Sequence, residues 1–265
     1  MGNGLADPFA GASAVVTGAG QGIGAAIARG LARRGVHVVV SGRRAATLEA
    51  VSDSIRAEGG SADYCVGDVT DPVHLDHLMS LAAGPRGSLD ILVNNAGIAG
   101  PTAPLVDISL EDWNKTLQVN LTGVFLACRA ALPYIAKSPH GKIVNIGSVT
   151  GKQPLPNRSP YAAAKLGVVG LTRTLAHEVG PAGISVNLVS PWLVEGDRLE
   201  GVLSSMSKER GLTPDELRAE MTDGTAFKRT VSEADVVEVV LFLCSPAANN
   251  LTGQDINVAA GAVMY

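Results

Sequence analysis

Short apolar runs alternate with longer amphipathic segments along most of the chain. The runs are rich in Val and Ile, which is typical of parallel strands covered by helices on both faces of a sheet. Seven runs are predicted to be strands: residues 14–17, 36–41, 62–66, 91–93, 142–146, 184–189 and 255–258. Because helical segments separate them, the pattern predicts strand–helix–strand units in an α/β domain.

Hydroxyl side chains placed three residues before an acid mark helix starts between the strands. Three starts have this pattern: Ser109 to Asp112, Thr213 to Glu216 and Ser232 to Asp235. The stretch from about 192 to 229 interrupts the alternation after the sixth strand, where binding loops of such sheets lie. We expect it to form a substrate lid. No linker or repeat divides residues 1–265, so we expect a single domain with this insertion.

The composition narrows the class of protein. Hydrophobic residues make up 46% of the 265 residues but aromatic residues only 4%, so the core must consist mainly of Ala, Val, Leu and Ile. A single α/β domain commonly reaches this length. The formal net charge of -4 offers no positive field to attract nucleic acid, which is therefore not an expected partner.

Cysteine, histidine and terminal sequences predict neither a metal site nor a membrane anchor. Cys65, Cys128 and Cys244 lie in separate apolar stretches without a CxxC pair, so we expect buried thiols rather than zinc ligands or disulfides. His74 and His77 have no carboxylate ligands around them and are expected on a solvated helix face. Residues 1–6 lack a secretion or myristoylation pattern, and no apolar run could span a bilayer. We therefore expect a soluble, cytoplasmic protein without a metal.

The first predicted strand ends in a glycine-rich turn that leads directly into a helical pattern. The turn reads Thr17-Gly18-Ala19-Gly20-Gln21-Gly22-Ile23-Gly24, and the helix is expected over residues 25–34. Glycines let the backbone approach a pyrophosphate, and a helix N-terminus attracts its negative charge. The turn is therefore a predicted dinucleotide site, with contacts from Gly18, Gly20, Gln21, Gly22, Ile23 and Gly24.

The spacing of these glycines and the motifs that follow resemble the short-chain dehydrogenase/reductase family. Gly18, Gly22 and Gly24 have the G-x-x-x-G-x-G spacing. The later motifs come in family order: Asn94-Asn95-Ala96-Gly97, Asn120, Ser148 and Tyr161-Ala162-Ala163-Ala164-Lys165. The resemblance covers residues 12–258. It implies a doubly wound, Rossmann-type parallel sheet of about seven strands and a homotetrameric assembly.

The resemblance also implies a catalytic set, which consists of Asn120, Ser148, Tyr161 and Lys165. Tyr161 would exchange a proton with the substrate oxygen, and Ser148 would hydrogen-bond that oxygen. Lys165 would hold the ribose hydroxyls of the cofactor, and Asn120 would support a water that relays protons to it. Tyr161 and Lys165 are four residues apart, so a helix presents them on one face. A phenolate at neutral pH costs ~4 kcal/mol, and a nearby ammonium lowers that cost.

The end of the second strand bears on which dinucleotide binds. NAD-preferring members of the family have an acid at the position of Gly42. Here Arg43 follows instead, and its guanidinium could clamp a 2′-phosphate with help from the Ser41 hydroxyl. However, Gln21 stands where many NADP-binding relatives have a second basic residue, and Arg43 and Arg44 could simply be solvated charges. NADP(H) is therefore the preferred cofactor, and NAD(H) stays open.

Further cofactor contacts are expected after the third, fourth and sixth strands. Asp68 and Val69 resemble the adenine contact, although Asp68 could instead cap a helix that begins near Asp71. The adenosine ribose is expected to be lined by Asn94, Ala96 and Gly97. The nicotinamide carboxamide is expected to meet Pro191 and the backbone of Val194.

One departure from the family lies after the sixth strand. Trp192 stands where the family usually has glycine, and Gly196 where it has threonine. Trp192 either walls the substrate pocket or packs under the lid, and as a wall it would favour a substrate with an apolar face. Charged lid residues that could meet a substrate are Glu195, Asp197, Arg198, Lys208, Arg210, Lys228 and Arg229.

Together these residues predict an oxidoreductase that transfers a hydride between NADP(H) and a small secondary alcohol or ketone. An NAD-dependent dehydrogenase of a polyol or a 3-hydroxy acid is the alternative, because residues 208–227 loosely resemble relatives that act on such substrates. A dinucleotide-sensing regulatory protein without turnover is a third hypothesis. The set of four catalytic residues argues against it, because a sensor has no need of them.

Overall fold

The computed structural model describes Phe9 and residues 11–265, so residues 1–6 lie outside the described part of the chain. Seven strands form one sheet in the order β3-β2-β1-β4-β5-β6-β7, and every neighbouring pair is parallel. The strands are Ser13–Thr17 (β1), His37–Gly42 (β2), Ser61–Val66 (β3), Ile91–Asn94 (β4), Lys142–Ile146 (β5), Ser185–Pro191 (β6) and Asp255–Val258 (β7). Each predicted strand is present, and the predicted α/β fold is confirmed.

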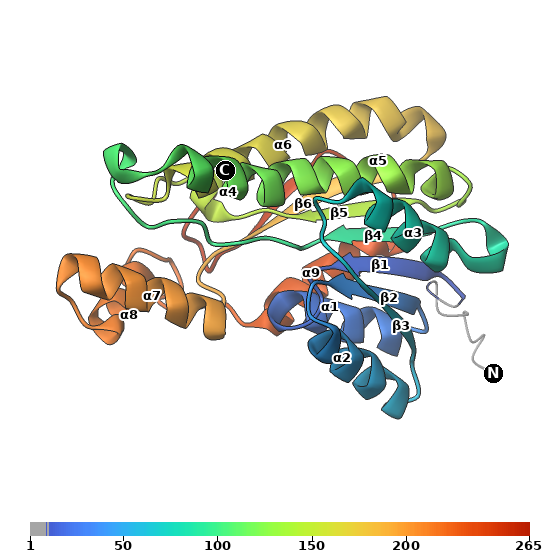
Figure 1. The fold of residues 1–265 in the computed structure, drawn as a ribbon, viewed down its shortest axis with the longest axis horizontal. Helices are drawn as coiled ribbons and strands as arrows, with labels where there is room; N and C mark the ends of the chain where they lie inside the picture. The colour runs from blue at the N-terminus through green and yellow to red at the C-terminus, as the bar shows by residue number, and fades with distance from the viewer. Residues whose placement is uncertain (1–8, 10) are drawn as a thin grey trace.

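Helices cover both faces of this sheet (Figure 1). One face carries α1 (Gly22–Arg33), α2 (Ala45–Ala57) and α9 (Glu233–Cys244). The other carries α3 (Pro72–Ala83), α5 (Gly123–Ile135) and α6 (Ser159–Val179), with α4 (Leu110–Leu117) packed beside α6. Successive strand residues point to opposite faces, so Val16 joins the first apolar layer and Val15 the second. The fold is therefore a doubly wound single domain.

Helix starts agree with the sequence where a cap announces them. The predicted hydroxyl caps are confirmed: Ser109 caps α4, Thr213 caps α8 (Pro214–Asp223) and Ser232 caps α9. The helix after the glycine turn begins at Gly22 and not at residue 25. Glycine has a low helix propensity, which conceals the first turn of α1 from a reading of the sequence.

The stretch from 192 to 229 contains two helices, α7 (Asp197–Arg210) and α8, which pack against each other at one end of the molecule (Figure 1). We call residues 195–230 the α7–α8 segment. Its own apolar cluster includes Leu199, Leu203 and Leu217. The two ends of the segment meet where Val194 and Val231 form a β-bridge, and Phe227 N nearby donates a hydrogen bond to Ala260 O at 3.0 Å. It is thus a folded appendage with a narrow base.

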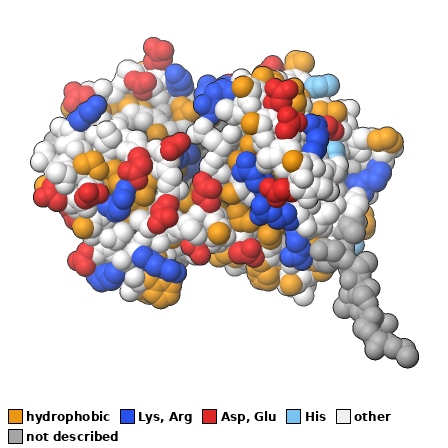
Figure 2. All heavy atoms as spheres, turned by 90° about the horizontal axis from the view of Figure 1, so that it is seen from below, with side chains coloured by type: hydrophobic (Ala, Val, Ile, Leu, Met, Phe, Trp, Pro, Cys, Tyr) orange, Lys and Arg blue, Asp and Glu red, His pale blue; other side chains and the backbone are white. Residues whose placement is uncertain are grey.

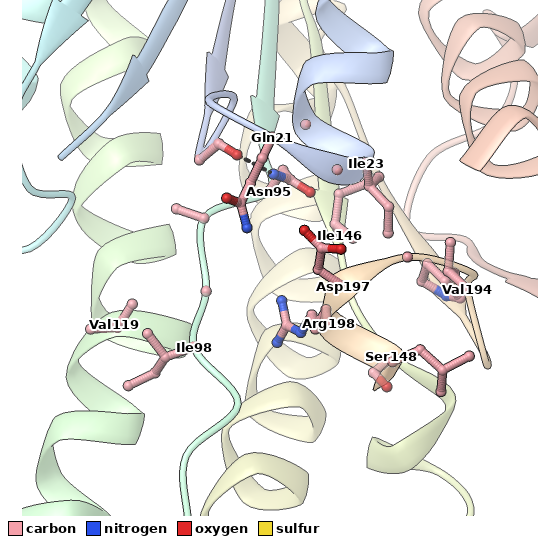
Figure 3. Close-up of a pocket in the computed structure, with 18 of the residues that line it drawn as sticks. Gln21, Ile23, Asn95, Ile98, Val119, Ile146, Ser148, Val194, Asp197 and Arg198 are labelled. Atoms are coloured by element: carbon pink, nitrogen blue, oxygen red, sulfur yellow. Dashed lines mark hydrogen bonds between the residues drawn. The ribbon is translucent and has the colours of Figure 1, made fainter. Parts of the chain in front are cut away.

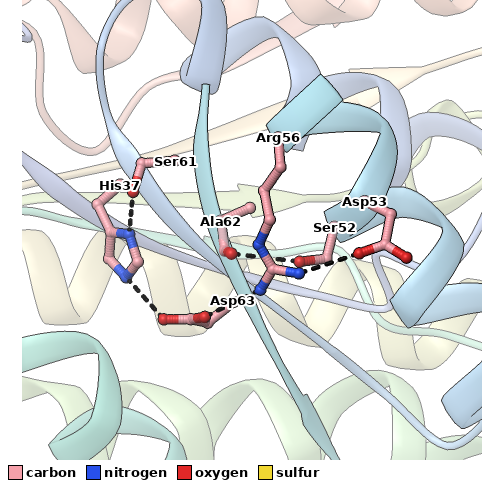
Figure 4. A network of polar contacts seen from close by, with 7 residues as sticks. All are labelled: His37, Ser52, Asp53, Arg56, Ser61, Ala62 and Asp63. Carbon is pink, nitrogen blue, oxygen red and sulfur yellow. Dashed lines mark hydrogen bonds and ion pairs between the residues drawn. The ribbon is translucent and has the colours of Figure 1, made fainter. Parts of the chain in front are cut away.

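A polar network lies at the outer edge of the sheet, around β3 (Figure 4). Asp63 accepts a hydrogen bond of 3.1 Å from Arg56 and lies 3.5 Å from His37 Nε2. His37 Nδ1 in turn lies 2.8 Å from Ser61 Oγ. These contacts tie α2 to β2 and β3 at the open side of the sheet. Charged side chains on an edge strand also discourage pairing with a further strand.

The three cysteines are buried free thiols, as expected. Burial raises the pKa of Cys128 and of Cys244 to about 12, so neither is a thiolate at neutral pH. Among the described residues, no group of three His, Cys, Asp or Glu side chains could hold a metal ion. In the same part of the chain, no helix is long and apolar enough to cross a membrane.

His74 differs from its expected place on a solvated helix face. It is only 8% exposed, and its ring nitrogens lie 3.0 Å from Ser41 Oγ and 3.8 Å from Cys65 Sγ. Burial is the main reason that the pKa of His74 is lowered, so the neutral ring is favoured. His77, by contrast, is exposed as expected. The spacing of the two histidines could not show that one of them faces the sheet.

Candidate active site

The carboxyl ends of the strands open into a cavity of about 560 Å³. Its wall runs from the glycine turn after β1, past the ends of β2 to β6, to the first residues of α7. Open parallel sheets bind ligands at this edge, where the strand order reverses, and here it reverses between β1 and β4. The cavity is therefore the candidate site. On the face drawn in Figure 2, basic and acidic side chains are interspersed, so no patch of one charge competes with it.

The glycine turn between β1 and α1 is packed too closely to accept side chains. A Cβ atom at Gly18 would lie 2.7 Å from Ala96 Cα, and one at Gly24 would lie 2.4 Å from Asn95 Nδ2. α1 begins here without a side-chain cap and without an acid in its first turn. The residues of the turn that line the cavity are Gly18, Gly20, Gln21, Gly22, Ile23 and Gly24. Unpaired N–H groups at a helix N-terminus suit a pyrophosphate, so these residues fit a dinucleotide.

Asn95, which the sequence analysis did not select, braces this turn (Figure 3). Its Nδ2 donates to Thr17 O at 3.1 Å and to Gly18 O at 3.0 Å. It lines the cavity together with Ala96 and Gly97. The double asparagine in the sequence was the available signal, but it did not show which of the two faces the ligand.

Asn94 points away from this cavity and is 3% exposed. Its Nδ2 donates to Asn145 Oδ1 at 2.9 Å, and Asn145 Nδ2 donates to Thr172 Oγ1 at 2.9 Å. This chain of buried side chains links β4, β5 and α6. The structure therefore does not bring Asn94 to the expected ribose contact, because successive residues at a strand end face opposite ways.

Tyr161 lies in the first turn of α6 on the cavity wall, which Ser148 from the turn after β5 also lines. It is 8% exposed. Burial alone would raise the pKa of Tyr161, but Arg198, Lys165, the Ser148 hydroxyl and Arg158 together lower it below its ordinary value. The surroundings thus favour the phenolate that an acid–base role requires.

Lys165 lies one turn further along α6 and is 4% exposed. Its Nζ donates to Ile146 O at 2.7 Å and lies 5.8 Å from the centre of the Tyr161 ring. The pKa of Lys165 is lowered, chiefly by burial, while Tyr161 acts to raise it. An ammonium has three donors, so this one faces the phenol with donors to spare for a ligand on the cavity wall.

Asn120 is fully buried in a π-helical turn, Gln118–Thr122, between α4 and α5. Its Oδ1 accepts from Ile98 N at 2.8 Å, and its Nδ2 donates to Ile98 O at 3.0 Å. Asn120 does not itself line the cavity, but it fixes Ile98, which does. Single π-helical turns are frequent at functional sites. The contact that the structure shows is therefore one that positions the wall.

Two arginines line the cavity beyond the end of β2. Arg43 Nη1 lies 4.0 Å from Asp68 Oδ2. Arg44 donates a hydrogen bond to Gln21 Oε1. Arg44 thus brings a guanidinium to the part of the glycine turn where the sequence lacks a second basic residue. From the sequence, Arg44 is expected only to be a solvated charge that starts a helix.

Of the two expected cofactor contacts Ser41 and Asp68, only Asp68 lines the cavity. Ser41 is fully buried against His74 and does not line the cavity, so the structure does not bring its hydroxyl to the expected phosphate. Asp68 does line it, together with Val69. The alternative that Asp68 caps the following helix is wrong, because Asp71 caps α3 by accepting a 2.9 Å hydrogen bond from Val73 N.

The end of β6 and the base of the α7–α8 segment form the remaining wall. Pro191, Trp192 and Val194 all line the cavity. Trp192 is half-buried and packs against two apolar clusters, one that contains Leu199 and another that contains Val263. Both readings of Trp192 therefore hold at once, since it borders the cavity and packs beneath the segment.

Two arginines that belong to no motif face Tyr161. The Cζ atoms of Arg158 and Arg198 lie 5.1 Å and 5.7 Å from the centre of its ring. Figure 3 shows Arg198 at the start of α7 reaching into the cavity. No sequence pattern indicates Arg158, and Arg198 is one of seven candidate charges in the lid.

Comparisons with known proteins agree over nearly the whole chain. The family model described as short chain dehydrogenase matches residues 12–206. The cis-4-hydroxycyclohexanecarboxylate dehydrogenase of Sinomonas cyclohexanicum is 38% identical over 97% of this chain and 98% of its own. The D-beta-hydroxybutyrate dehydrogenase of Rhizobium meliloti is 34% identical over 94% and 97%. The solved structure of a variant actinorhodin polyketide ketoreductase with NADPH has a TM-score of 0.91, at 35% identity over 96% of this chain and 98% of that one.

Proposed function

The chain belongs to the short-chain dehydrogenase/reductase family, and on that basis we propose that it transfers a hydride between NADP(H) and a small secondary alcohol or ketone. It is an oxidoreductase of alcohol and ketone groups from a nicotinamide-dependent family. One observation carries the proposal: the glycine turn and the Tyr161 phenol lie on the wall of the same cavity. A dinucleotide site that continues into an acid–base group suits this reaction.

The catalytic roles that we propose are those implied by the family resemblance, and the positions of Tyr161, Ser148 and Lys165 around one cavity support them. When bound, the nicotinamide supplies a hydride for ketone reduction or accepts one in alcohol oxidation. In reduction, Tyr161 donates its proton to the carbonyl oxygen, which Ser148 also hydrogen-bonds. Lys165 stabilises the phenolate that remains and holds the ribose hydroxyls. Asn120 supports the water through which the proton of Tyr161 is replaced.

The preference for NADP(H) rests on the two arginines beyond β2. Gly42 offers no carboxylate to a ribose 2′-hydroxyl, and Arg43 and Arg44 both line the cavity there. Guanidinium groups bind phosphate through charge-assisted hydrogen bonds. Asp68 lies 4.0 Å from Arg43, and its carboxylate partly offsets the positive charge that would attract a 2′-phosphate. The alternative, an NAD-dependent dehydrogenase of a polyol or a 3-hydroxy acid, therefore stays open. The D-beta-hydroxybutyrate dehydrogenase among the relatives acts on such an acid, as its name states.

Binding assays followed by turnover assays test this function. We expect the purified protein to bind NADPH about tenfold or more tightly than NADH, the scale of one hydrogen bond to a charged group. We also expect it to reduce at least one ketone in a panel of small cyclic and linear ketones. Equal affinity for both dinucleotides would remove the NADP(H) preference. Binding without turnover in either direction would favour the dinucleotide sensor.

The proposal also covers the assembly of the enzyme, its lid and its location in the cell. Phe125 on α5 and Leu166 on α6 are 44% and 52% exposed, and both helices cover the same face of the sheet. These exposed apolar side chains support a contact between copies on this face in the proposed homotetramer, which light scattering would test. The α7–α8 segment acts as the substrate lid of a single domain. A cytoplasmic location fits the three buried thiols.

A further inference from the structure

Three cations surround Tyr161, and only one of them has a role in the proposed mechanism. Lys165 acts on the phenol and the ribose. Arg158 and Arg198 approach the ring more closely than Lys165 does, at 5.1 Å and 5.7 Å against 5.8 Å. They come from the residue before α6 and from the first turn of α7. Both line the cavity.

Arg158 is a buried cation without a carboxylate partner among the described residues. It is 5% exposed, and its two Nη atoms donate at 2.9 Å to Thr102 Oγ1 and to Ala99 O. Its Nε is buried and has no hydrogen-bond partner. A buried charge without a counter-charge is unfavourable. The pKa of Arg158 is accordingly lowered, mainly by burial. The guanidinium therefore has both a charge and a donor to offer to an anion.

Arg198 differs from Arg210 and Arg218 of the same segment. Arg210 pairs with Glu220, and Arg218 pairs with Glu200, on the exposed surface. Arg198 makes no hydrogen bond or ion pair with any side chain that the structure describes, and it points into the cavity (Figure 3). Glu195 and Asp197 also line the cavity, but Glu195 accepts a hydrogen bond of 2.6 Å from Thr230. The five N–H donors of Arg198 are thus available to a ligand.

The wall around these arginines is apolar. Six apolar residues that line the cavity belong to the apolar cluster of the α7–α8 segment, and they are Leu155, Trp192, Leu193, Leu199, Val202 and Met221. The glycine turn, Arg43 and Arg44 lie at its other end, so the phosphates of a dinucleotide have separate partners. A ligand that satisfies this end must combine an apolar skeleton with an anionic group.

We propose that the substrate is an oxo acid, or the matching hydroxy acid, whose carboxylate is bound by Arg158 and Arg198 while its reacting oxygen meets Tyr161. This inference rests on the proposed function and names its substrate class. A planar guanidinium pairs with a carboxylate through two parallel hydrogen bonds. The apolar wall, including Trp192, packs against the carbon skeleton between the two groups.

Matched pairs of substrates test the inference. Each oxo acid, such as levulinate or 4-oxocyclohexanecarboxylate, is assayed beside its methyl ester, which keeps the skeleton and removes the charge. We expect the best acid to exceed its ester by about 10- to 100-fold in kcat/KM, the scale of hydrogen bonds to a charged group. Arg198→Ala should lower that ratio by about tenfold, mainly through a higher KM for the acid, because only Arg158 then remains to bind the carboxylate. Arg198→Lys should restore part of it.

Two controls separate charge recognition from damage to the fold. Arg210→Ala removes an arginine of α7 that lies outside the cavity, so it should leave the ratio unchanged. Arg158→Lys keeps the charge, whereas Arg158→Met removes it. If Arg158→Met lowers the melting temperature, Arg158→Lys and Arg198→Ala still test whether positive charge selects the acid over the ester. The preference for the acid should be largely kept in Arg158→Lys and lowered in Arg198→Ala.

A binding measurement distinguishes failure of this inference from failure of the proposed function. The acid and its ester are titrated calorimetrically into protein that carries NADP+. Esters that bind and react as well as the acids would overturn the inference and leave hydride transfer standing. Tight binding of the acid alone, lost in Arg198→Ala, would support the inference even if no ketone were reduced. Absence of turnover with every pair would count against the proposed function instead.

Discussion

Tyr161 is surrounded by charges that come from distant parts of the chain. Lys165 follows it by one helical turn, Arg158 precedes it by three residues, and Arg198 comes from α7. The Tyr161 and Lys165 pair could be predicted because helical spacing alone places the two on one face. Arg198 could not be assigned, because its position depends on how the α7–α8 segment folds over the cavity.

Tyr161→Phe should lower kcat by about 10²- to 10⁴-fold, because it removes the proton donor and keeps the ring. The dissociation constant of NADPH should change little, since the glycine turn is untouched. Stopped-flow turnover and fluorescence titration measure the two quantities. Tyr134→Phe on α5 is the matched control and should be active, because Tyr134 does not line the cavity. A Tyr161→Phe variant with half the parent rate would exclude the phenol from the mechanism.

The pH dependence of alcohol oxidation should report the charges around Tyr161. Burial raises the pKa of the phenol, but Arg198 is the largest influence that lowers it. Oxidation needs the phenolate, so its rate should rise with pH through the lowered pKa and then level off. Arg198→Ala removes a cation and should shift this rise to higher pH. The profile of kcat measures the shift, and a midpoint that stays or falls would contradict the assignment.

Arg43→Ala should weaken NADPH binding by about 1.5–3 kcal/mol, the scale of hydrogen bonds to a charged group. Binding of NADH should be nearly unaffected, because NADH lacks the 2′-phosphate. Arg44→Ala should weaken NADPH binding in the same direction, since Arg44 lines the same wall. Calorimetric titration of the parent and the two variants with both dinucleotides gives the six dissociation constants. A loss that is equal for NADPH and NADH would assign Arg43 to the adenosine and not to the phosphate.

At the scale of elements, the sequence predicted what local patterns encode. Strands were found because burial on both faces leaves near-continuous apolar runs, and α8 was found because Thr213 and Glu216 form a capping box. α7 starts without a side-chain cap, after Gly196 with a φ of +126°, so no sequence pattern announces it. The π-helical turn at Gln118–Thr122, in which Asn120 pairs with Ile98 from a distant part of the chain, was equally hidden.

Trp192→Gly should affect both the α7–α8 segment and the substrate site. The indole lines the cavity and packs against the clusters around Leu199 and Val263. We expect a raised KM for the best ketone, and a loss of stability below the ~3–5 kcal/mol typical of a fully buried large aromatic. Trp192→Phe keeps an apolar wall and should recover most of both. An unchanged KM with a large fall in melting temperature would limit Trp192 to packing.

At the scale of the whole molecule, the two edges of the sheet have different tasks. The carboxyl edge forms the cavity, while the amino edge is held by Asp90 in front of β4. Asp90 accepts hydrogen bonds from Ser13 N at 2.8 Å, Arg86 at 2.6 Å and Ser138 at 2.6 Å. These contacts join β1, β4 and the approach to β5 on the side away from the site.

Asp90→Asn should destabilise the protein by about 1.5–3 kcal/mol at neutral pH, since charge-assisted hydrogen bonds are lost. Burial raises the pKa of Asp90, but the Ser138, Arg86 and Ser13 contacts lower it further, so the folded pKa lies below the unfolded one. The contribution is therefore complete above the unfolded pKa and disappears as pH falls through the folded pKa. Urea unfolding of parent and variant at neutral pH and at about pH 3 measures the narrowing difference. Exposed Asp76→Asn on α3 is the control, and a difference independent of pH would contradict this account.

The narrow base of the α7–α8 segment has a consequence for how new specificities arise. Because the chain departs and returns at the bridge between Val194 and Val231, and the helices carry their own apolar cluster, recombination between relatives can exchange this piece as one cassette. The exchanged segment either carries an arginine at the position of Arg198 or lacks one, whereas Tyr161 and the glycine turn belong to the rest of the domain and are kept. Substrate specificity can thus change during evolution while the catalytic residues stay the same.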